Sequence, residues 1–237
     1  MNKSIFYHNL NQLFIKSGMS LLTFSTHFLK SEKWMEACLK GKKKPGLSFF
    51  HVLIEKFQVD LNQFLTQKWP TPQAISAKVD KIKLVVSDID GVLTDGGMYY
   101  TESGDEGKKF NTKDGMALKR LHAAGFLTGF LSNGFNTKLI ESRAALLKVN
   151  YTYVGKDAKV PILEKWMATA DLNWENVAYI GDDINDLAVI EHCGLSACPR
   201  DAVSAVQAKV DLLLSRKGGD ACFREFVDEW LLNNQKA

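Results

Sequence analysis

Short runs of apolar residues recur along the C-terminal two thirds of the chain, at lengths typical of buried β-strands. The clearest are Ile82–Val86, Leu127–Leu131 and Val177–Ile180, and glycine or polar residues follow each of them. The strands predicted in this way lie at 82–88, 127–131, 151–154, 177–180, 195–197 and 211–214. The pattern predicts an α/β fold, with a doubly wound, mainly parallel, Rossmann-like sheet and helices between its strands.

The N-terminal third has a different pattern, in which apolar positions recur at helical spacing. Four or five short amphipathic helices are predicted there, at residues 10–18, 20–29, 31–41, 47–57 and 61–65. Pro70 and Pro72 should then interrupt any helix, because proline disfavours the helical conformation in the residue before it. We therefore predict a small all-α domain at residues 1–67, a linker at 68–80 and an α/β domain at 81–237.

After the first predicted strand, the sequence favours a β-hairpin. Residues 98–101 form one arm, residues 102–105 contain the turn, and the chain returns through Gly107 to Asn111. Asp114 is then expected to cap a helix that ends near residues 124–125. Neither the 44 positions from Asp88 to Ser132 nor the 27 from Ser132 to Lys159 can hold a cap domain of ordinary size.

Acidic side chains gather where predicted strands end. The first strand ends in two carboxylates, Asp88 and Asp90, which are two residues apart and so point to the same side of an extended backbone. Two carboxylates about 4 Å apart repel each other by on the order of 4 kcal/mol at an effective dielectric of roughly 20, which favours a bound cation or a reaction at this place. Asp182, Asp183 and Asp186 follow the fourth predicted strand.

A hydroxyl and a cation complete this set of groups. Ser132 comes directly after the strand that ends at Leu131, and Lys159 comes next along the chain, with Lys156 as the alternative lysine. A nucleophilic carboxylate, a neighbouring acid or base, a hydroxyl and a lysine are what phosphoryl transfer requires. Ligands that are all oxygen atoms favour Mg²⁺ over zinc.

The four motifs in this order resemble those of the haloacid dehalogenase (HAD) superfamily of phosphatases. They are Asp88-Ile89-Asp90-Gly91-Val92-Leu93-Thr94-Asp95, then Ser132, then Lys159, then Gly181-Asp182-Asp183 with Asp186. The resemblance extends from about residue 81 to the C-terminus, and it implies a capless HAD-like fold and a phosphoric monoester hydrolase.

The resemblance also implies roles for individual residues. Asp88 would attack phosphorus and form an aspartyl-phosphate, and Asp90 would protonate the leaving alkoxide and then activate water. Ser132 and Lys159 would hold phosphoryl oxygens. Mg²⁺ would be bound by the Asp88 carboxylate, the Asp90 backbone carbonyl and Asp182. The two remaining acids, Asp183 and Asp186, would orient waters or Lys159.

A finer resemblance concerns the substrate. The segment Gly96-Gly97-Met98-Tyr99-Tyr100, with Lys109-Phe110-Asn111 and Asp114-Gly115, is similar to the 3-deoxy-D-manno-octulosonate 8-phosphate phosphatases and their nononate 9-phosphate relatives. Those enzymes act in lipopolysaccharide or sialic-acid-like biosynthesis as homotetramers whose hairpins and C-terminal tails close each other's sites. The resemblance implies a phosphorylated keto-deoxy sugar acid as substrate and four substrate-binding residues: Asn133, Gly134, Lys109 and Asp114.

The chain departs from that family at two places. Ser132-Asn133-Gly134 stands where the family usually has Thr-Gly-Arg, and Asp220 and Ala221 follow the tail glycines, Gly218-Gly219. An anion in place of a cation should weaken binding of an anionic ligand. Arg216 and Lys217 are candidates for the missing tail cation, with a solvated charge pair as the alternative.

The N-terminal helices resemble the helix-turn-helix domain of the Cro and phage-repressor type, with Lys40-Gly41-Lys42-Lys43-Lys44 after the candidate recognition helix at 31–38. Residues 1–80 carry eleven lysines and five acids, a net charge of +6, which favours contact with phosphates. However, this segment has no arginine, and Glu32 and Glu36 lie on the candidate helix. DNA binding is therefore less favoured than a role in packing, oligomerisation or docking.

Composition changes this picture little. The chain has 237 residues, of which 46% are hydrophobic and 24% charged, and its apolar runs are too short for a membrane span. The pattern of a secretion signal is missing, and the four cysteines show neither C-x-x-C spacing nor a histidine cluster, so we expect a cytoplasmic protein with reduced thiols. Two alternative functions remain: a DNA-binding regulator that senses a sugar phosphate, and a phosphatase for a macromolecular substrate.

Overall fold

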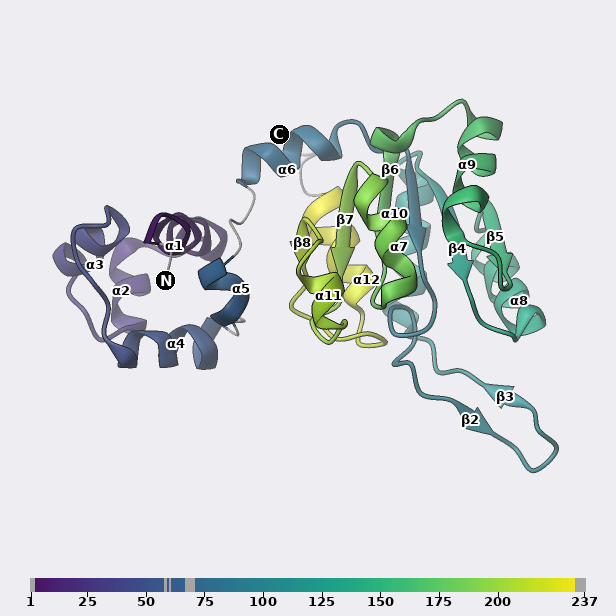
Figure 1. Cartoon of the computed structure of the whole chain (residues 1–237), viewed down its shortest axis with the longest axis horizontal. Helices are drawn as coiled ribbons and strands as arrows, with labels where there is room; N and C mark the ends of the chain where they lie inside the picture. Colours follow the sequence, from purple (N-terminus) through teal and green to yellow (C-terminus); the bar gives the residue numbers. More distant parts are fainter. Residues whose placement is uncertain (1–2, 58, 60, 67–70, 233–237) are drawn as a thin grey trace. The chain divides into compact units, whose positions relative to one another are not determined.

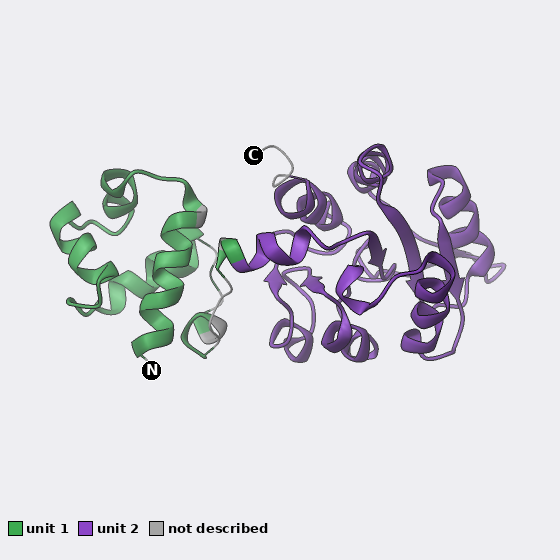
Figure 2. Ribbon diagram, turned by 90° about the horizontal axis from the view of Figure 1, so that it is seen from above, with its two compact units in different colours: residues 1–73 green, residues 74–237 purple. Residues whose placement is uncertain are grey.

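The computed structural model describes residues 3–57, 59, 61–66 and 71–232. These residues fall into two compact units, residues 1–73 and residues 74–237, which Figure 2 colours separately. Each unit has its own hydrophobic core.

The second unit is built on a six-stranded sheet in the order β5-β4-β1-β6-β7-β8, and each pair of neighbours is parallel (Figure 1). Its strands are β1 (Leu84–Ser87), β4 (Leu127–Ser132), β5 (Tyr151–Val154), β6 (Val177–Ile180), β7 (Leu195–Cys198) and β8 (Leu212–Leu213). The predicted fold class is confirmed, and each predicted strand has its counterpart. The strand order reverses beside β1, and open α/β sheets place their binding sites at such a point.

Helices cover both faces of this sheet. One core contains side chains of α7 (Thr112–Ala123), α8 (Thr137–Leu147) and α12 (Cys222–Glu225), while the other contains those of α9 (Lys159–Ala170), α10 (Leu187–His192) and α11 (Ser204–Gln207). Strand residues alternate between the two cores: Val85 faces the first, and Leu84 and Val86 face the second. The strands are therefore mainly apolar, with a few buried polar residues such as Thr128 and Ser196, and the acidic residues follow the strand ends. Short helical turns lie at Trp174–Asn176, Ile184–Asp186 and Phe226–Leu231.

The predicted hairpin is present as β2 (Tyr99–Tyr100) and β3 (Glu106–Gly107), and it projects from the second unit (Figure 1). Tyr99 pairs with Gly107, and both tyrosines of β2 are exposed. An isolated antiparallel bridge between Thr94 and Phe110 joins the base of the hairpin to the loop after β1.

The predicted cap of the next helix was wrong. Asn111 caps α7, because its backbone is extended and its side chain accepts a hydrogen bond from the Lys113 backbone N–H at 3.0 Å. Asp114 instead lies in the first turn of α7. It is buried, and its Oδ1 accepts a hydrogen bond from the Arg224 backbone N–H at 2.8 Å.

The N-terminal unit is all-helical, with α1 (Lys3–Ser17), α2 (Leu21–His27), α3 (Glu32–Leu39), α4 (Leu47–Phe57) and α5 (Leu61–Thr66). The first helix begins earlier than its apolar pattern indicated. Phe6, Phe24, Phe49 and Phe64 are fully buried in its core, together with Met35. Aromatic residues thus form the interior of this unit.

The segment predicted as a linker contains a helix, α6 (Pro72–Val79). Proline is well tolerated at the first position of a helix, where its missing N–H has no partner to lose. Ile75 and Val79 are buried in the core of the second unit. Residues 67–70 lie outside the described residues, so the exact domain boundary stays a prediction. No helix among the described residues is long and apolar enough to cross a membrane.

Candidate active site

Asp88 is the first residue after β1, and it is 5% exposed. Its backbone N–H donates to the carbonyl of Ile180 at 3.0 Å, which continues the pairing of β1 with β6. Burial raises the pKa of Asp88 to about 7, with the charge of Lys159 opposing the rise and that of Asp186 adding to it. The strand β1 thus places the side chain of Asp88 at the edge of the sheet where the parallel strands end, buried away from water.

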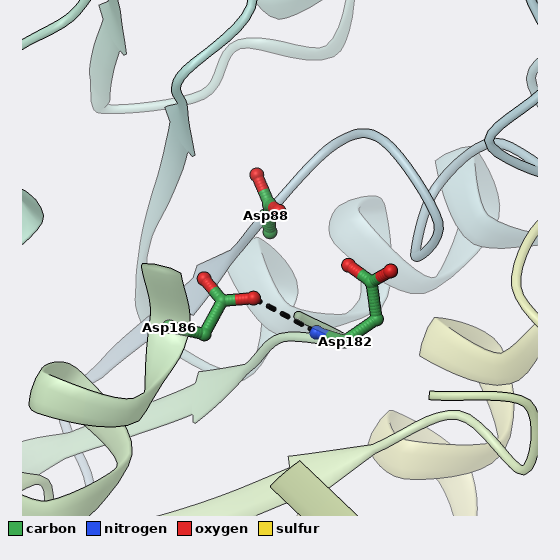
Figure 3. Close-up of side chains that lie close together, drawn as sticks. All are labelled: Asp88, Asp182 and Asp186. Atoms are coloured by element: carbon green, nitrogen blue, oxygen red, sulfur yellow. Dashed lines mark hydrogen bonds between the residues drawn. The ribbon is translucent and has the colours of Figure 1, made fainter. Parts of the chain in front are cut away.

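Asp88, Asp182 and Asp186 converge at this edge, as Figure 3 shows. One carboxylate oxygen from each lies within 4.8 Å of the others. Burial, together with the charges of Asp88, Asp186 and Asp183, raises the pKa of Asp182 to about 8. Such a cluster is stable only if cations or protons offset the repulsion between its carboxylates.

Lys159 supplies one such cation. It begins α9, is 3% exposed, and its ammonium lies 3.1 Å from Asp88 Oδ1 and 2.6 Å from Asp186 Oδ1. Burial lowers the pKa of Lys159, but the two carboxylates raise it by more. Lys156, in contrast, is exposed and lies over the ring of Phe135 at 5.4 Å. The structure therefore places Lys159, and not Lys156, beside the predicted nucleophile.

The hydrogen bonds of Asp186 hold the cluster together. Its Oδ1 also accepts from the Tyr179 hydroxyl at 2.5 Å, and its Oδ2 accepts from the backbone N–H groups of Asp182 and Asp183 at 2.8 and 3.1 Å. Asp183 is exposed and accepts from the Ile184 N–H at 2.7 Å as a helix cap. All acceptor positions of Asp186 are thus directed to protein donors.

The donor set at this edge fits a hard divalent cation. Asp182 Oδ1 is buried and has no hydrogen-bond partner among the described residues, although buried carboxylate oxygens are normally paired. Asp182 therefore has an unpaired oxygen to offer a metal, and Asp88 offers a second carboxylate beside it, whereas Asp186 is occupied by Lys159 and Tyr179. Gly91 makes room for this arrangement, because a Cβ at its positive φ of +82° would lie 2.0 Å from Asp182 Oδ2.

Asp90 and Ser132 both lie beside Gly134. Ser132 ends β4, is 1% exposed, and accepts a hydrogen bond from the Gly134 backbone N–H at 2.9 Å. A Cβ at Gly134 would lie 3.1 Å from Ser132 Oγ and 3.3 Å from Asp90 Oδ2. These two side chains thus approach the same point, and glycine keeps the space between them clear.

Three of the predicted substrate-binding residues have other contacts. Asn133 donates to the carbonyls of Gly155 and Asp157 at 3.0 and 3.1 Å and accepts from Asn185 at 3.1 Å. Lys109 is exposed, with its ammonium 3.6 Å from Asp95. Asp114 lines a small cavity with Phe110 and Arg143, among others, and binds Arg224 as described above. The structure does not bring these side chains into the carboxylate cluster.

Sequence reasoning missed two polar residues at this site. Tyr179 lies within the apolar strand β6, so its hydroxyl gave no separate signal. Lys108, next to Lys109, donates to Asp90 Oδ1 at 2.7 Å. Burial lowers the pKa of Lys108, and the hydrogen bonds to Asp90 and Glu106 raise it by more. The alternation of side chains along the returning arm of the hairpin places Lys108 and Lys109 on opposite faces, but it does not indicate which face meets Asp90.

The burial of Asp114 gives a testable pH dependence. Burial raises its pKa from 3.8 to about 7, so the native state binds a proton that the unfolded state has released. The free energy of unfolding therefore falls as pH rises from about 4 to about 7, by on the order of 4 kcal/mol from this group at most. In Asp114→Asn this contribution should vanish. Urea unfolding at pH 5 and pH 8 should show that the stability of Asp114→Asn, relative to that of wild type, is higher at pH 8 than at pH 5. Parallel pH profiles would contradict the assignment.

A parallel sheet that carries a buried aspartate, a lysine and a divalent-cation site at its switch point defines a hydrolase of the haloacid dehalogenase type. Residues 154–222 match the family described as haloacid dehalogenase-like hydrolase. The 3-deoxy-D-manno-octulosonate 8-phosphate phosphatase KdsC of Haemophilus influenzae is 38% identical over 151 residues, which cover 64% of this chain and 83% of the relative. The chain belongs to the KdsC-like phosphatases of this superfamily.

Solved structures agree with this assignment. A probable yrbi family phosphatase from Pseudomonas syringae has a TM-score of 0.67 and 39% identity, over 69% of this chain and 92% of that chain. The octulosonate 8-phosphate phosphatase of Moraxella catarrhalis, solved with magnesium, phosphate and KDO, has a TM-score of 0.65 and 28% identity, over 68% of this chain and 91% of that chain. The predicted superfamily and the phosphatase activity are confirmed.

Proposed function

We propose that this protein is a Mg²⁺-dependent phosphomonoesterase for a phosphorylated keto-deoxy sugar acid of the octulosonate 8-phosphate or nononate 9-phosphate type. The observation that carries the proposal is the position of Asp88, buried beside Lys159 and Asp182 at the switch point of the sheet, in a chain 38% identical to an octulosonate 8-phosphate phosphatase. A phosphatase for a macromolecular substrate is the alternative that the open, capless site leaves.

In the proposed reaction, Asp88 attacks phosphorus and forms an aspartyl-phosphate while Asp90 gives a proton to the leaving sugar oxygen. Asp90 then takes a proton from the water that releases phosphate from Asp88. Lys159, held by Asp186 and Tyr179, stabilises negative charge on the phosphoryl oxygens, and the Ser132 hydroxyl donates to one of them.

Asp88, Asp182 and the backbone carbonyl of Asp90 would hold Mg²⁺. The ion supplies charge stabilisation at the phosphoryl group and offsets the repulsion between Asp88 and Asp182. The unpartnered Asp182 Oδ1 and the space that Gly91 leaves support this assignment. We propose that Asp186 positions Lys159 and that Asp183 caps the turn that presents Asp182.

We propose a homotetramer in which hairpins take part in assembly. The support is the exposure of Met98, Tyr99 and Tyr100, which is unusual for three consecutive large apolar side chains on a projecting hairpin. We assign binding of the substrate's acid group to Gly134 and to Lys109, whose side chain is mostly exposed.

For the N-terminal unit we propose a helix-turn-helix-like arrangement. In its support, Ser20 and Ser31 cap α2 and α3, and the turn between these helices contains Leu29 in the left-handed conformation, at a φ of 52°. The lysines at 40 and 42–44 are exposed. Glu36 on α3 pairs with Lys40 at 2.5 Å and would face DNA phosphates with a negative charge, so DNA stays the less favoured ligand.

The test is phosphate release from a panel of octulosonate 8-phosphate, nononate 9-phosphate, glucose 6-phosphate and a phosphopeptide, each with Mg²⁺ and with EDTA. We expect the sugar-acid phosphates to have a kcat/KM at least about tenfold above glucose 6-phosphate, and EDTA to abolish turnover of every substrate. Preference for the phosphopeptide would favour the macromolecular alternative. Full activity in EDTA would refute the role of the metal.

A further inference from the structure

One buried cation beside Asp90 has no role in the reaction as described so far. Lys108 follows β3, and its side chain is 4% exposed. Its ammonium lies 2.7 Å from Asp90 Oδ1 and 2.6 Å from Glu106 Oε1. A buried ammonium needs a paired carboxylate, and Glu106 alone would satisfy that need. The second contact, with Asp90, therefore calls for a separate explanation.

The base of the hairpin is fixed so that Lys108 points at Asp90. Glu106 and Lys108 are two residues apart on an extended arm, so both side chains leave it on the same side. Beyond them, Phe110 forms a β-bridge with Thr94 in the loop that follows Asp90. On the other side, the Asn136 amide donates to the Glu106 carbonyl at 3.0 Å. These anchors hold the Lys108 backbone between the loops after β1 and β4.

The contacts of Asp90 are divided unequally between its two oxygens. Within the described residues, its hydrogen bonds fall on Oδ1, which accepts from Lys108 at 2.7 Å and from Thr94 Oγ1 at 3.4 Å. Oδ2 lies on the side of Gly134 and Ser132, 3.3 Å from the position of a Cβ at Gly134. One oxygen is thus held by the protein, and the other is directed to the space where the substrate would react.

We propose that Lys108 is a positioning residue that holds Asp90 by Oδ1 so that Oδ2 exchanges the proton with the leaving oxygen and later with water. This inference rests on the proposed role of Asp90. In the first step the bond from phosphorus to the sugar oxygen breaks, a bond to Asp88 forms, and the Asp90 proton moves to the sugar oxygen. In the second step Asp90 takes a proton from the attacking water, and phosphate leaves Asp88 with its carboxylate restored.

A comparison of two leaving groups can distinguish a positioning role of Lys108 from a purely structural one. A sugar alkoxide must be protonated as it leaves, whereas p-nitrophenolate is stable without a proton. Loss of Lys108 should therefore slow the first step for a sugar phosphate and spare it for p-nitrophenyl phosphate. The second step is the same for both substrates, since both give the same aspartyl-phosphate.

The experiment is a single turnover with enzyme in excess and Mg²⁺ present, comparing wild type with Lys108→Met. Sugar release from octulosonate 8-phosphate, or from the best sugar phosphate of the panel above, should slow by about 100-fold, and p-nitrophenol release by less than about threefold. With excess p-nitrophenyl phosphate, the variant should show a burst of one p-nitrophenol per site, because Asp90 no longer activates water. Lys119→Met, which replaces an exposed lysine of α7, is the matched control and should leave both rates unchanged.

Equal slowing of the two first steps, or a change in KM alone, would overturn the inference. Lys108→Gln keeps hydrogen-bonding capacity without the charge, and it serves as the second variant if Lys108→Met does not fold. We expect Lys108→Gln, like Lys108→Met, to slow sugar release more than p-nitrophenol release. Asp88→Asn separates the two hypotheses: if it retains activity the proposed reaction fails, and if it is inactive while Lys108→Met slows both leaving groups equally, only the role of Lys108 fails.

Discussion

Replacing Asp88 with asparagine is expected to lower kcat by at least about 10⁴-fold for every phosphate ester that the enzyme hydrolyses, because the amide cannot form the covalent intermediate. The substitution is nearly isosteric, and it removes a charge from a cluster in which burial already raises the pKa of Asp88 to about 7. Lys159 keeps its 2.6 Å contact with Asp186, so its ammonium stays paired. Loss of activity should therefore come without loss of fold.

Steady-state kinetics and thermal unfolding of the same preparation test this expectation. The melting temperature of Asp88→Asn should equal or exceed that of wild type, because repulsion within the Asp88, Asp182 and Asp186 cluster decreases. Asp80→Asn removes an exposed carboxylate ahead of β1 and should retain normal kcat. Retention of more than about a hundredth of wild-type activity by Asp88→Asn would exclude this residue as the nucleophile.

The sequence was sufficient to predict the sheet, because most of its strands are buried on both faces and are mainly apolar. Val177–Ile180 shows this most clearly, since its residues enter the cores on both faces of the sheet and acidic residues follow where it ends. The same change from apolar to polar marked Asp88 and Asp182. Parallel strands bring their carboxyl ends to one edge, so residues far apart in sequence were expected to meet there.

Contacts that depend on tertiary packing could not be predicted from the sequence. Asp114 had the type and position of a helix cap, but Asn111 takes that role, and Asp114 is buried against the segment around Arg224, which lies 110 residues away in sequence. Lys108 and Lys109 are neighbours of one type, and only the way the hairpin base packs decides which of them contacts Asp90. The alternation along an extended arm was visible, but the face directed at Asp90 was not.

The second large effect is expected at Lys159. Its side chain is 2% exposed and contacts two carboxylates, so Lys159→Met should leave Asp88 and Asp186 without their cation. Removing one partner of a buried ion pair typically costs about 3–5 kcal/mol. In addition to this loss of stability, the loss of a group that stabilises the phosphoryl oxygens should lower kcat by about 10²- to 10³-fold.

The pH dependence distinguishes this loss of charge from a simple packing defect. The charge of Lys159 lowers the pKa of Asp88, so without it Asp88 should bind a proton more tightly in the native state. The instability of Lys159→Met should therefore be smaller at pH 5.5 than at pH 8. Urea unfolding at both values measures it. Lys156→Met is the matched comparison, because Lys156 is exposed and contacts only an exposed ring among its described interactions. Its stability should change by less than about 0.5 kcal/mol, with kcat near that of wild type. The reverse result would assign the phosphate contact to Lys156 and would leave Lys159 as a purely structural cation.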